Sequence, residues 1–339
     1  MGVAVARAER DRRAGAKRRR RERRFGMNAR ERPGEGLRRI SLGQLDVAIE
    51  ALRGGAGSSP ERRVHEARKA LKRLRALLRL LEDELGERAY EHESAVVREV
   101  GRRLAQARDA EVLLSTLDGL IERDPKRLGA RGGVQRLRGR LQSERDGAAQ
   151  RALSGEAHGG AVAELLGLRA RVETWELSHA ERIEALEPAL ARIYGTGRRR
   201  MRRAAGASDR RSQARRLHEW RKRVKDLRYV AEALDAADAR GADKRARARA
   251  AFLGKVARRA DDLGETLGEE HDLAVLAGRV RDEARTSGTP GRSSRKALLK
   301  AIARRRKRLQ RRALRLGARL YRRRRKRFAR RVRAAVSRR

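Results

Sequence analysis

Val64-His-Glu-Ala-Arg-Lys-Ala-Leu-Lys-Arg-Leu-Arg75 and Leu217-His-Glu-Trp-Arg-Lys-Arg-Val-Lys-Asp-Leu-Arg228 are two copies of one twelve-residue motif, 153 positions apart. Seven of the twelve positions are identical, in the frame H-E-x-R-K-x-x-K-x-L-R. The histidine, the arginines and the lysines recur in register. A repeat of this kind predicts that the chain was built by internal duplication of one structural unit.

Helical geometry separates each copy into two faces. At about 100° per residue, the first copy places its cations in a sector of about 120° around the histidine; this basic stripe comprises His65, Arg68, Lys69, Lys72, Arg75 and Arg79. The opposite face carries Ala67, Leu71, Leu74, Leu78 and Leu81. The second copy gives a basic stripe of His218, Arg221, Lys222, Lys225 and Arg228, opposite Trp220, Val224, Leu227, Ala231 and Leu234. The spacing predicts two amphipathic helices.

The basic stripes have two interpretations. A surface helix in any strongly basic chain shows a solvated cationic face, and this is the plainer one. Two observations favour a bound anion instead: histidine is rare, with six in the chain, yet one heads both stripes, and acids inside the frames are limited to Glu66, Glu219 and Asp226. We therefore expect the two stripes to hold a polyanion.

A weaker echo follows each copy. Residues 104–113 (LAQARDAEVL) match residues 267–276 (LGEEHDLAVL) at four of ten positions, and both contain an aspartate, Asp109 and Asp272. We expect each aspartate to face the basic helix of its own repeat and to orient an arginine or histidine by a charge-assisted hydrogen bond. An ordinary exposed aspartate is the alternative.

The composition limits the possible fold class and cellular compartment. Lys and Arg number 91 against 45 Asp and Glu, a formal charge of +46, while 39% of the residues are hydrophobic. That fraction suffices for a buried core, and alternating strand patterns do not occur, so the predicted class is all-α. The chain has no cysteine, no apolar run long enough to span a membrane and no hydrophobic segment of a signal peptide. We expect a cytoplasmic protein without membrane contact, whose start is Met1 or Met27.

Turn and cap residues predict the boundaries. Residues 1–36 are expected to form a disordered basic arm, and residues 37–335 the folded part, with a first repeat over about 37–178 and a second over about 179–335. Ser58 or Ser59 should cap a helix that carries the first motif to Leu85, and the next helix should run to about Arg123. A helix over 180–205 ends in a basic run in which Arg199 and Arg202 are expected to add to the binding surface. The basic end at 322–339 is expected to be solvated or bound to an anion.

These motifs resemble the CHAD family, the conserved-histidine α-helical domain. The resemblance rests on H-x-x-R-K-x-x-K-x-L-R in both halves and on the segments 104–113 and 267–276, and it covers roughly residues 36–335. It implies two four-helix bundles related by a pseudo-twofold axis, with a basic groove or pore that binds inorganic polyphosphate; some members locate to polyphosphate granules. It assigns binding to His65, Arg68, Lys69, Lys72, Arg73 and Arg75 and to His218, Arg221, Lys222, Lys225 and Arg228. Asp226 departs from the pattern, because it stands where the first half has Arg73.

Polyphosphate binding is thus the first functional hypothesis. The ligand carries about one charge per phosphate and no bases, so a protein needs cations to bind it rather than stacking surfaces. Nonspecific binding of DNA, RNA or ribosomes through the basic ends is the alternative, although aromatic residues make up 3% of the chain and no nucleic-acid-binding motif is recognisable. An enzyme is not expected: H-E-x-x-H is missing, since residues 69 and 222 are lysines, and no catalytic residue, metal site or cofactor is predicted. The sequence does not set the oligomeric state.

Overall fold

Helices account for all the regular secondary structure in the described part of the computed structural model. That part comprises residues 25–28, 31–54, 58–154, 156–206, 209–235, 244–286 and 291–334, and it contains no strand. The first half holds α2 (Pro33–Arg53), α3 (Pro60–Leu80), α4 (Glu82–Leu85), α5 (Glu87–Arg103), α6 (Ala105–Arg123), the π-helical turn η1 (Pro125–Gly129), α7 (Gly132–Ala152) and α8 (Glu156–Glu173). The second half holds the 3-10 turns η2 (Ser178–Glu181) and η3 (Ile183–Leu186), then α9 (Glu187–Ala205), α10 (Arg210–Ala233), α11 (Lys244–Thr286), α12 (Arg292–Leu320) and α13 (Arg325–Ala334). The predicted all-α class is confirmed.

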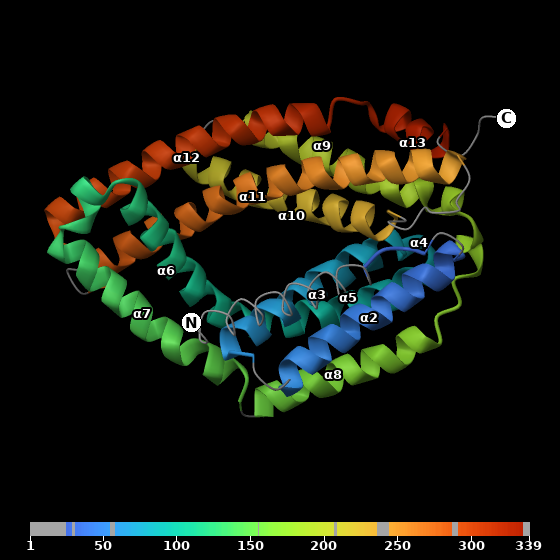
Figure 1. Cartoon of the computed structure of the whole chain (residues 1–339), viewed down its shortest axis with the longest axis horizontal. Coiled ribbons are helices and arrows are strands. Elements are labelled where there is room, and N and C mark those ends of the chain that lie inside the picture. The colour runs from blue at the N-terminus through green and yellow to red at the C-terminus, as the bar shows by residue number, and fades with distance from the viewer. Residues whose placement is uncertain are drawn as a thin grey trace, which may run out of the picture.

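The helices form two groups of four. In one group α2 packs on α3 and α8, and α5 packs on α3 and α8; in the other, α10 packs on α9 and α11, and α12 packs on α11 and α9. The groups meet where α3 packs on α10, and they lie on opposite sides of a central opening (Figure 1). That the two halves arose by duplication and are related by a pseudo-twofold axis stays a prediction.

A hairpin of α6 and α7 closes the ring at one end. Its apolar residues form a separate cluster with the second half of α11 and the first half of α12, built from side chains such as Leu117, Leu137, Leu276 and Ile302. The rest of α11 and α12 belongs to the main core, which is shared by both groups of helices. The length of α11, 43 residues, follows from its place in both clusters.

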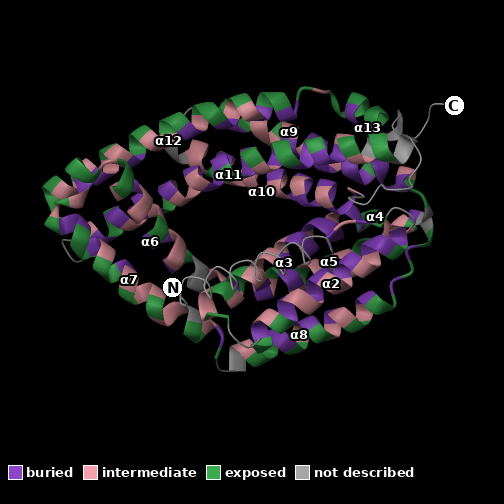
Figure 2. Cartoon of the chain, in the orientation of Figure 1, coloured by how far each residue is buried: buried purple, intermediate pink, exposed green. Residues whose placement is uncertain are grey.

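Burial of the apolar stripes orients the repeat helices. On α3 the side chains of Val64, Ala67 and Leu74 are at most 1% exposed, and on α10 Trp220 and Val224 are fully buried. Figure 2 shows buried residues on the faces where α3 and α10 meet their neighbours. Burying these stripes is favourable by roughly 25 cal/mol per Å² of apolar surface, so the opposite, basic stripes are directed away from the core.

Local cap residues begin α3 and α10 as predicted, but α3 ends at Leu80 rather than at Leu85, and Leu81 separates it from the short helix α4. The Ser59 hydroxyl accepts a hydrogen bond from the Arg62 amide at 3.4 Å, with Pro60 in the first turn of α3. The Asp209 carboxylate accepts from the Ser212 amide at 2.8 Å at the start of α10. Gly86 ends α4 with a φ of 73°, a left-handed conformation that glycine adopts without strain. Ser208, expected to share the second cap, and residues 287–290 of an expected loop lie outside the described residues.

Two further helices have boundaries that differ from those predicted. The helix expected to reach Arg123 is two helices broken at Leu104, a buried residue with φ −83° and ψ 0°. The break separates two packing environments, because α5 belongs to the first four-helix group whereas α6 packs on α7 and α11. The helix expected from residue 180 begins at Glu187, with Pro188 in its first turn, where a missing amide proton costs nothing.

The fold also extends into both predicted ends. The basic arm expected over 1–36 is too long, since α2 begins at Pro33, Phe25 and Met27 are buried, and the Met27 amide donates to the Ala233 carbonyl at 3.0 Å. At the other end the run Arg322–Arg327 is mostly exposed, as expected, whereas Phe328 and Val332 are buried where α13 packs on α9, so the solvated end does not extend through this helix. The remaining predicted ends, 1–24 and 335–339, lie outside the described residues.

No helix in the described ranges is both long and apolar enough to cross a lipid bilayer.

Candidate functional site

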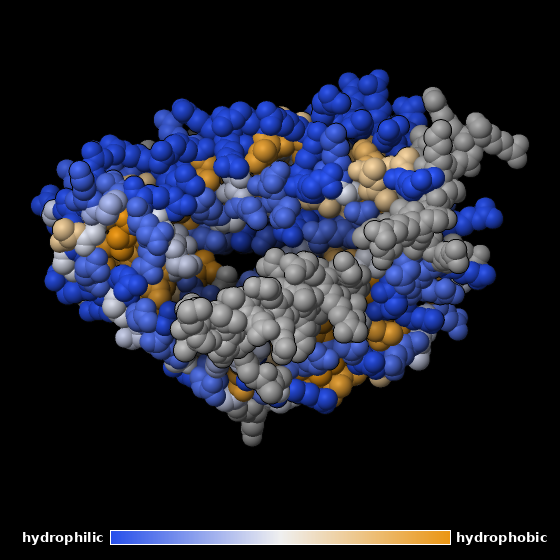
Figure 3. Space-filling view, viewed as in Figure 1, coloured by the Kyte–Doolittle hydropathy of each residue, from blue (hydrophilic) through white to orange (hydrophobic). Residues whose placement is uncertain are grey.

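A cavity of about 960 Å³ lies between the two groups of helices. Its walls come from α3, α5 and α6 on one side and from α10 and α11 on the other. The space-filling view shows a hydrophilic recess at this level, between the upper and lower halves of the molecule (Figure 3). Ten Lys and Arg side chains line the cavity, together with three histidines and four carboxylates; the cations are Arg68, Lys69, Lys72, Arg75, Arg98, Arg102, Arg221, Lys222, Lys225 and Arg228.

The two copies of the motif face this one cavity. From α3 it is lined by His65, Arg68, Lys69, Lys72 and Arg75, and from α10 by His218, Arg221, Lys222, Lys225 and Arg228. The basic stripes were placed on these faces by helical periodicity, and the packing of α3 on α10 brings them together. The geometry is therefore that of a single basic site to which each half contributes its motif helix.

Four residues predicted to bind the anion lie elsewhere. Arg73 is 8% exposed; its guanidinium lies 4.1 Å from the centre of the Phe25 ring and 4.0 Å from the Glu232 carboxylate. Ala70 and Leu77, which lie one turn before and one turn after Arg73 on the helix, are also buried, so this side of α3 packs against its neighbours. Arg199 and Arg202 are exposed on α9 and line none of the cavities described, and Arg199 donates to the Thr196 hydroxyl at 2.8 Å.

Arg79, the fourth of these residues, links the two repeat helices. It donates to the Asp226 carboxylate at 3.0 Å, and Arg223 lies 3.3 Å from the same group. Asp226 is 3% exposed. The acid that departs from the resemblance thus neutralises two arginines at the contact between α3 and α10, where a buried carboxylate requires charged partners.

Several cations that line the cavity are partly neutralised by acidic residues on α10 and α11. Arg228 donates to Glu232 at 2.6 Å and to Asp261, and Lys222 donates to Glu219 at 2.6 Å. These contacts fix the direction of the side chains. The cations still outnumber the carboxylates that line the cavity by more than two to one.

The aspartate of the second echo segment lies near an arginine of the second basic stripe. The Asp272 carboxylate lies 4.0 Å from the guanidinium of Arg221, across the contact between α11 and α10. Asp109 of α6 also lines the cavity. The side chain of residue 108, which precedes Asp109 in the echo segment, is not among the side chains that the structure describes.

Three basic residues of the cavity were missed in the sequence. Arg98 and Arg102 stand four positions apart on α5, a spacing that places both on one helix face. His271 of α11 stands in the echo motif at the position of Arg108. Because α5 has no copy of the twelve-residue motif, only the tertiary packing shows that its arginines face the same cavity.

His218 and His271 form a close pair at the wall of the cavity. Their Nδ1 atoms are 3.2 Å apart and their ring centres 4.2 Å apart. Burial lowers the pKa of His271 to about 3, with the neighbouring His218 and Arg221 adding to the effect. Burial also lowers the pKa of His218, followed by the charges of Lys222 and Arg221. Both rings are thus neutral at pH 7 while the cavity holds no anion.

Lys225 also has a lowered pKa in these surroundings. Burial lowers its pKa to about 8, with Arg221 contributing further, although Asp272 opposes the shift. Burial likewise lowers the pKa of Arg75. A bound anion would favour the charged form of each group, so the site is electrostatically matched to anions.

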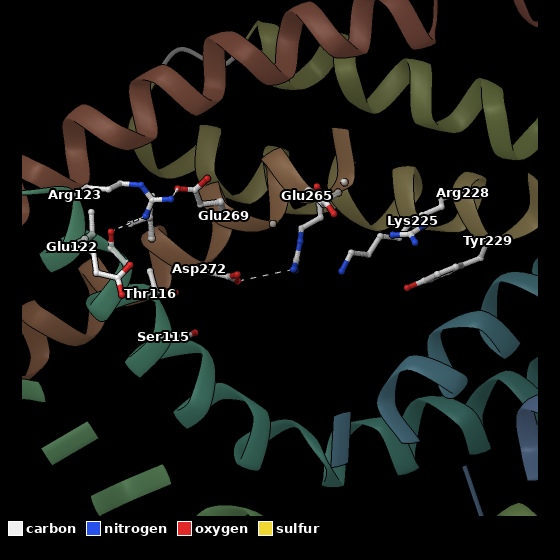
Figure 4. A pocket seen from close by; sticks show the side chains of 16 residues that line it. Ser115, Thr116, Glu122, Arg123, Lys225, Arg228, Tyr229, Glu265, Glu269 and Asp272 are labelled. Atoms are coloured by element: carbon white, nitrogen blue, oxygen red, sulfur yellow. Dashed lines mark hydrogen bonds and ion pairs between the residues drawn. The ribbon is translucent and has the colours of Figure 1, made fainter. Parts of the chain in front are cut away.

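A second cavity of about 530 Å³ adjoins the first and extends along α6 and α11. The two share six lining residues, including Arg221, Lys225 and Asp272. In Figure 4 the labelled side chains of α10 and α11 lie along one side of an open space, and Arg123 points toward Glu269 at one end of it. The Arg123 guanidinium lies 3.7 Å from the Glu269 carboxylate.

Within the described residues, no group of three or more histidine, cysteine, aspartate or glutamate side chains is arranged to hold a metal ion. The arrangement of the cavity is that of a binding site: cations from several helices face one space.

Comparison with known proteins is consistent with this fold. None of the curated proteins matches the chain. The crystal structure of the CHAD domain from the plant Ricinus communis superposes with a TM-score of 0.56 at 22% identity, covering 86% of this chain and 93% of that one. PptA from Streptomyces chartreusis superposes with a TM-score of 0.58 at 17% identity, covering 85% of this chain and 100% of that one. A family model described as the CHAD domain matches residues 41–253, more than half of the sequence, so this chain belongs to the CHAD domain family.

Proposed function

We propose that this chain binds inorganic polyphosphate in the central cavity. The observation that carries the proposal is the set of ten cations that α3, α5 and α10 direct into one cavity against four carboxylates. Polyphosphate is a thin, flexible chain of charged phosphates, so it can follow such a cavity and contact cations on both walls. Some CHAD family members bind polyphosphate, and the domain generally acts in binding rather than in catalysis, which supports the same assignment.

The residues of the site divide by role. Lys69, Lys72, Lys222 and Lys225 supply compact charges, while Arg68 and Arg221 offer forked donors that can contact two phosphate oxygens at once. The imidazole rings of His65, His218 and His271 add further hydrogen-bond donors to the site.

Nucleic acid is the alternative polyanion. Single-stranded DNA or RNA in a groove is normally held by stacking of its bases on aromatic side chains. Of the described Phe, Trp and Tyr residues, only Tyr229 lines the central cavity, and it is 6% exposed. The cavity therefore favours a polyanion without bases, and nonspecific nucleic-acid binding is better suited to the outer basic surface.

We further propose that binding serves a scaffold role at polyphosphate granules in the cytoplasm. The charge of +46 and the absence of a catalytic motif in the sequence support a binding partner of the granule rather than an enzyme that builds or degrades it. A fluorescent fusion should co-localise with polyphosphate granules, and the groove variant described next should not.

Calorimetric titration of the full chain with tripolyphosphate tests the site. Replacing Lys69, Lys72, Lys222 and Lys225 with Gln removes four groove charges, whereas replacing Lys126, Lys296, Lys300 and Lys326 with Gln removes four exposed charges that line none of the cavities described. We expect the groove variant to bind at least about 100-fold more weakly, at roughly 1 kcal/mol per lost contact, and the control to bind like the wild type. Equal losses in the two variants would reject the cavity as the binding site.

A further inference from the structure

A third cavity, of about 410 Å³, is lined by residues from the end of α6 and from α12. Six cations line it, namely Arg123, Arg304, Arg305, Lys307, Arg308 and Arg311, against a single acid, Asp124. In the described part of the chain no residue forms an ion pair with Arg304, Lys307, Arg308 or Arg311. Those four side chains are exposed. This hollow, here called the outer site, contributes nothing to the central cavity's lining.

The outer site lies next to the cavity that adjoins the central one. The adjoining cavity along α6 and α11 shares six residues with the central one, and it shares Leu120 and Arg123 with the outer site. Arg123 thus lies between an inner basic space and an outer one. Lys225, Arg123 and Arg308 line three neighbouring cavities in turn.

One carboxylate stands at the junction. Glu269 accepts two hydrogen bonds from Arg305, at 2.7 and 2.8 Å, whereas Arg123 lies at 3.7 Å and is 53% exposed. Hydrogen bonding to Arg305 lowers the pKa of Glu269, so the carboxylate stays charged and stays paired. An exposed ion pair such as Arg123–Glu269 contributes little to stability. Arg123 can therefore exchange Glu269 for a phosphate at small cost.

We propose that the outer site is where a long polyphosphate chain leaves the central cavity and is bound a second time. This inference rests on the function proposed above. A chain that fills the central cavity continues past Arg123 and is then held by Arg304, Lys307, Arg308 and Arg311. A solvated basic helix face would explain exposed arginines, but not a hollow between α12 and α6 that shares Leu120 and Arg123 with the adjoining cavity.

The physical consequence is a dependence on chain length. Two sites joined by one ligand bind it more tightly than either site alone, because the second contact occurs at a high effective concentration. A ligand too short to span both sites gains nothing from the second. Long-chain polyphosphate should therefore depend on the outer site, whereas tripolyphosphate, whose tightest binding is in the central cavity, should not.

The test compares two variants of the full chain that lose the same charge. The outer variant carries Arg304→Gln, Arg308→Gln and Arg311→Gln; its control carries Arg315→Gln, Arg319→Gln and Arg322→Gln, three exposed arginines that line none of the described cavities. Glutamine preserves helix propensity, so both variants should fold. Affinities for tripolyphosphate and for long-chain polyphosphate are measured at physiological salt.

We expect the outer variant to bind long chains about tenfold more weakly and tripolyphosphate as the wild type does, with the control unchanged for both. An outer variant that keeps wild-type affinity for long chains overturns the proposal, and so does a control that loses as much. The four-lysine groove variant separates the two claims: its retention of tripolyphosphate binding would reject the central site itself, whatever the outer variant shows.

Lysine labelling gives a second, residue-level measurement. Long chains should protect Lys307 from an amine-reactive reagent, whereas tripolyphosphate at a concentration that saturates the central cavity should leave Lys307 reactive. Lys300, which is exposed on the same helix but outside the outer site, should react equally in all conditions. Reactivity of Lys307 that long chains do not change would count against the outer site.

Discussion

The protonation states of single residues in the central cavity depend on burial and on a surplus of positive charge. Lys225, His218 and His271 all have lowered pKa values, and in each case burial is the largest cause. In the folded protein these groups carry less charge than they would in water. Binding of an anion should restore that charge, which makes proton uptake a direct measure of occupancy.

Lys225 gives the first prediction. With a pKa of about 8, roughly half of this side chain is neutral at pH 8 in the free protein, and nearby phosphates should raise the pKa. Binding should then take up protons, and the affinity should fall as the pH rises above about 8. Calorimetry at pH 8 in two buffers with different heats of ionisation should give different apparent heats, and Lys225→Met should abolish the part of the difference due to this group. Identical heats in the wild type would contradict the argument.

The histidine pair predicts how stability depends on pH. Because the pKa of His271 is about 3 when folded and about 6.5 when unfolded, the unfolded chain binds more protons between these values. The free energy of unfolding should therefore fall as the pH falls below about 6.5. We expect the loss between pH 7 and pH 5 to be about 1–2 kcal/mol smaller in His271→Gln, measured by urea denaturation without polyphosphate. His92→Gln, at an exposed position outside the cavity, should keep the wild-type pH dependence.

At the scale of the helices, the contact between α3 and α10 places the two basic stripes. Arg79 and the buried Asp226 connect these helices. Removing Arg79 leaves Asp226 with Arg223 as its one remaining partner among the contacts described. Arg79→Met should thus lower the free energy of unfolding by about 2 kcal/mol, and adding Asp226→Asn should recover at least half of this loss. Denaturant titration measures both variants.

The same variant tests whether Arg79 binds the ligand. Since Arg79 lies outside the central cavity, Arg79→Met should keep its affinity for tripolyphosphate within about twofold, a change below 0.5 kcal/mol. A large loss of affinity without a loss of stability would show that Arg79 contributes to the binding site, as helical periodicity predicted.

The last helix provides a prediction about the ends of the chain. The Phe328 ring stacks on Tyr194 with centres 3.9 Å apart and is 2% exposed. Phe328→Ala should reduce the free energy of unfolding by about 3 kcal/mol, as expected for a buried aromatic residue. Arg327→Ala, on the exposed side of the same helix, should change it by less than about 0.5 kcal/mol. Similar stability of Phe328→Ala and the wild type would show that α13 is not part of the core.

Periodicity within one helix was readable from the sequence, and packing between helices was not. The apolar and basic faces of α3 and α10 follow from spacings of three and four residues, and ten predicted binding residues do line one cavity. Arg73 and Arg79 were misplaced because their surroundings depend on Phe25 and Asp226, which are distant in sequence. The break at Leu104 was not predicted because no proline marks it and the nearest glycine, Gly101, lies inside α5; α13 was not predicted because of its high charge.

At the scale of the molecule, the site belongs to neither half alone. α3 and α5 form one wall and α10 and α11 the other, so each half supplies only part of the charge. The formal charge of +46 ensures attraction to any polyanion at low salt, which means that binding by itself does not identify the ligand. Selectivity at physiological salt does identify it.

Competition binding near physiological salt tests the central claim most directly. Labelled long-chain polyphosphate bound to the full chain is displaced by duplex DNA, single-stranded RNA or unlabelled polyphosphate at matched charge concentration, for the wild type, the four-lysine groove variant and its four-lysine control. We predict that polyphosphate competes at least about tenfold better than either nucleic acid, and that this preference is lost only in the groove variant. Equal competition by nucleic acid, with the groove variant behaving like the control, would contradict the account and identify the chain as a nonspecific nucleic-acid-binding protein.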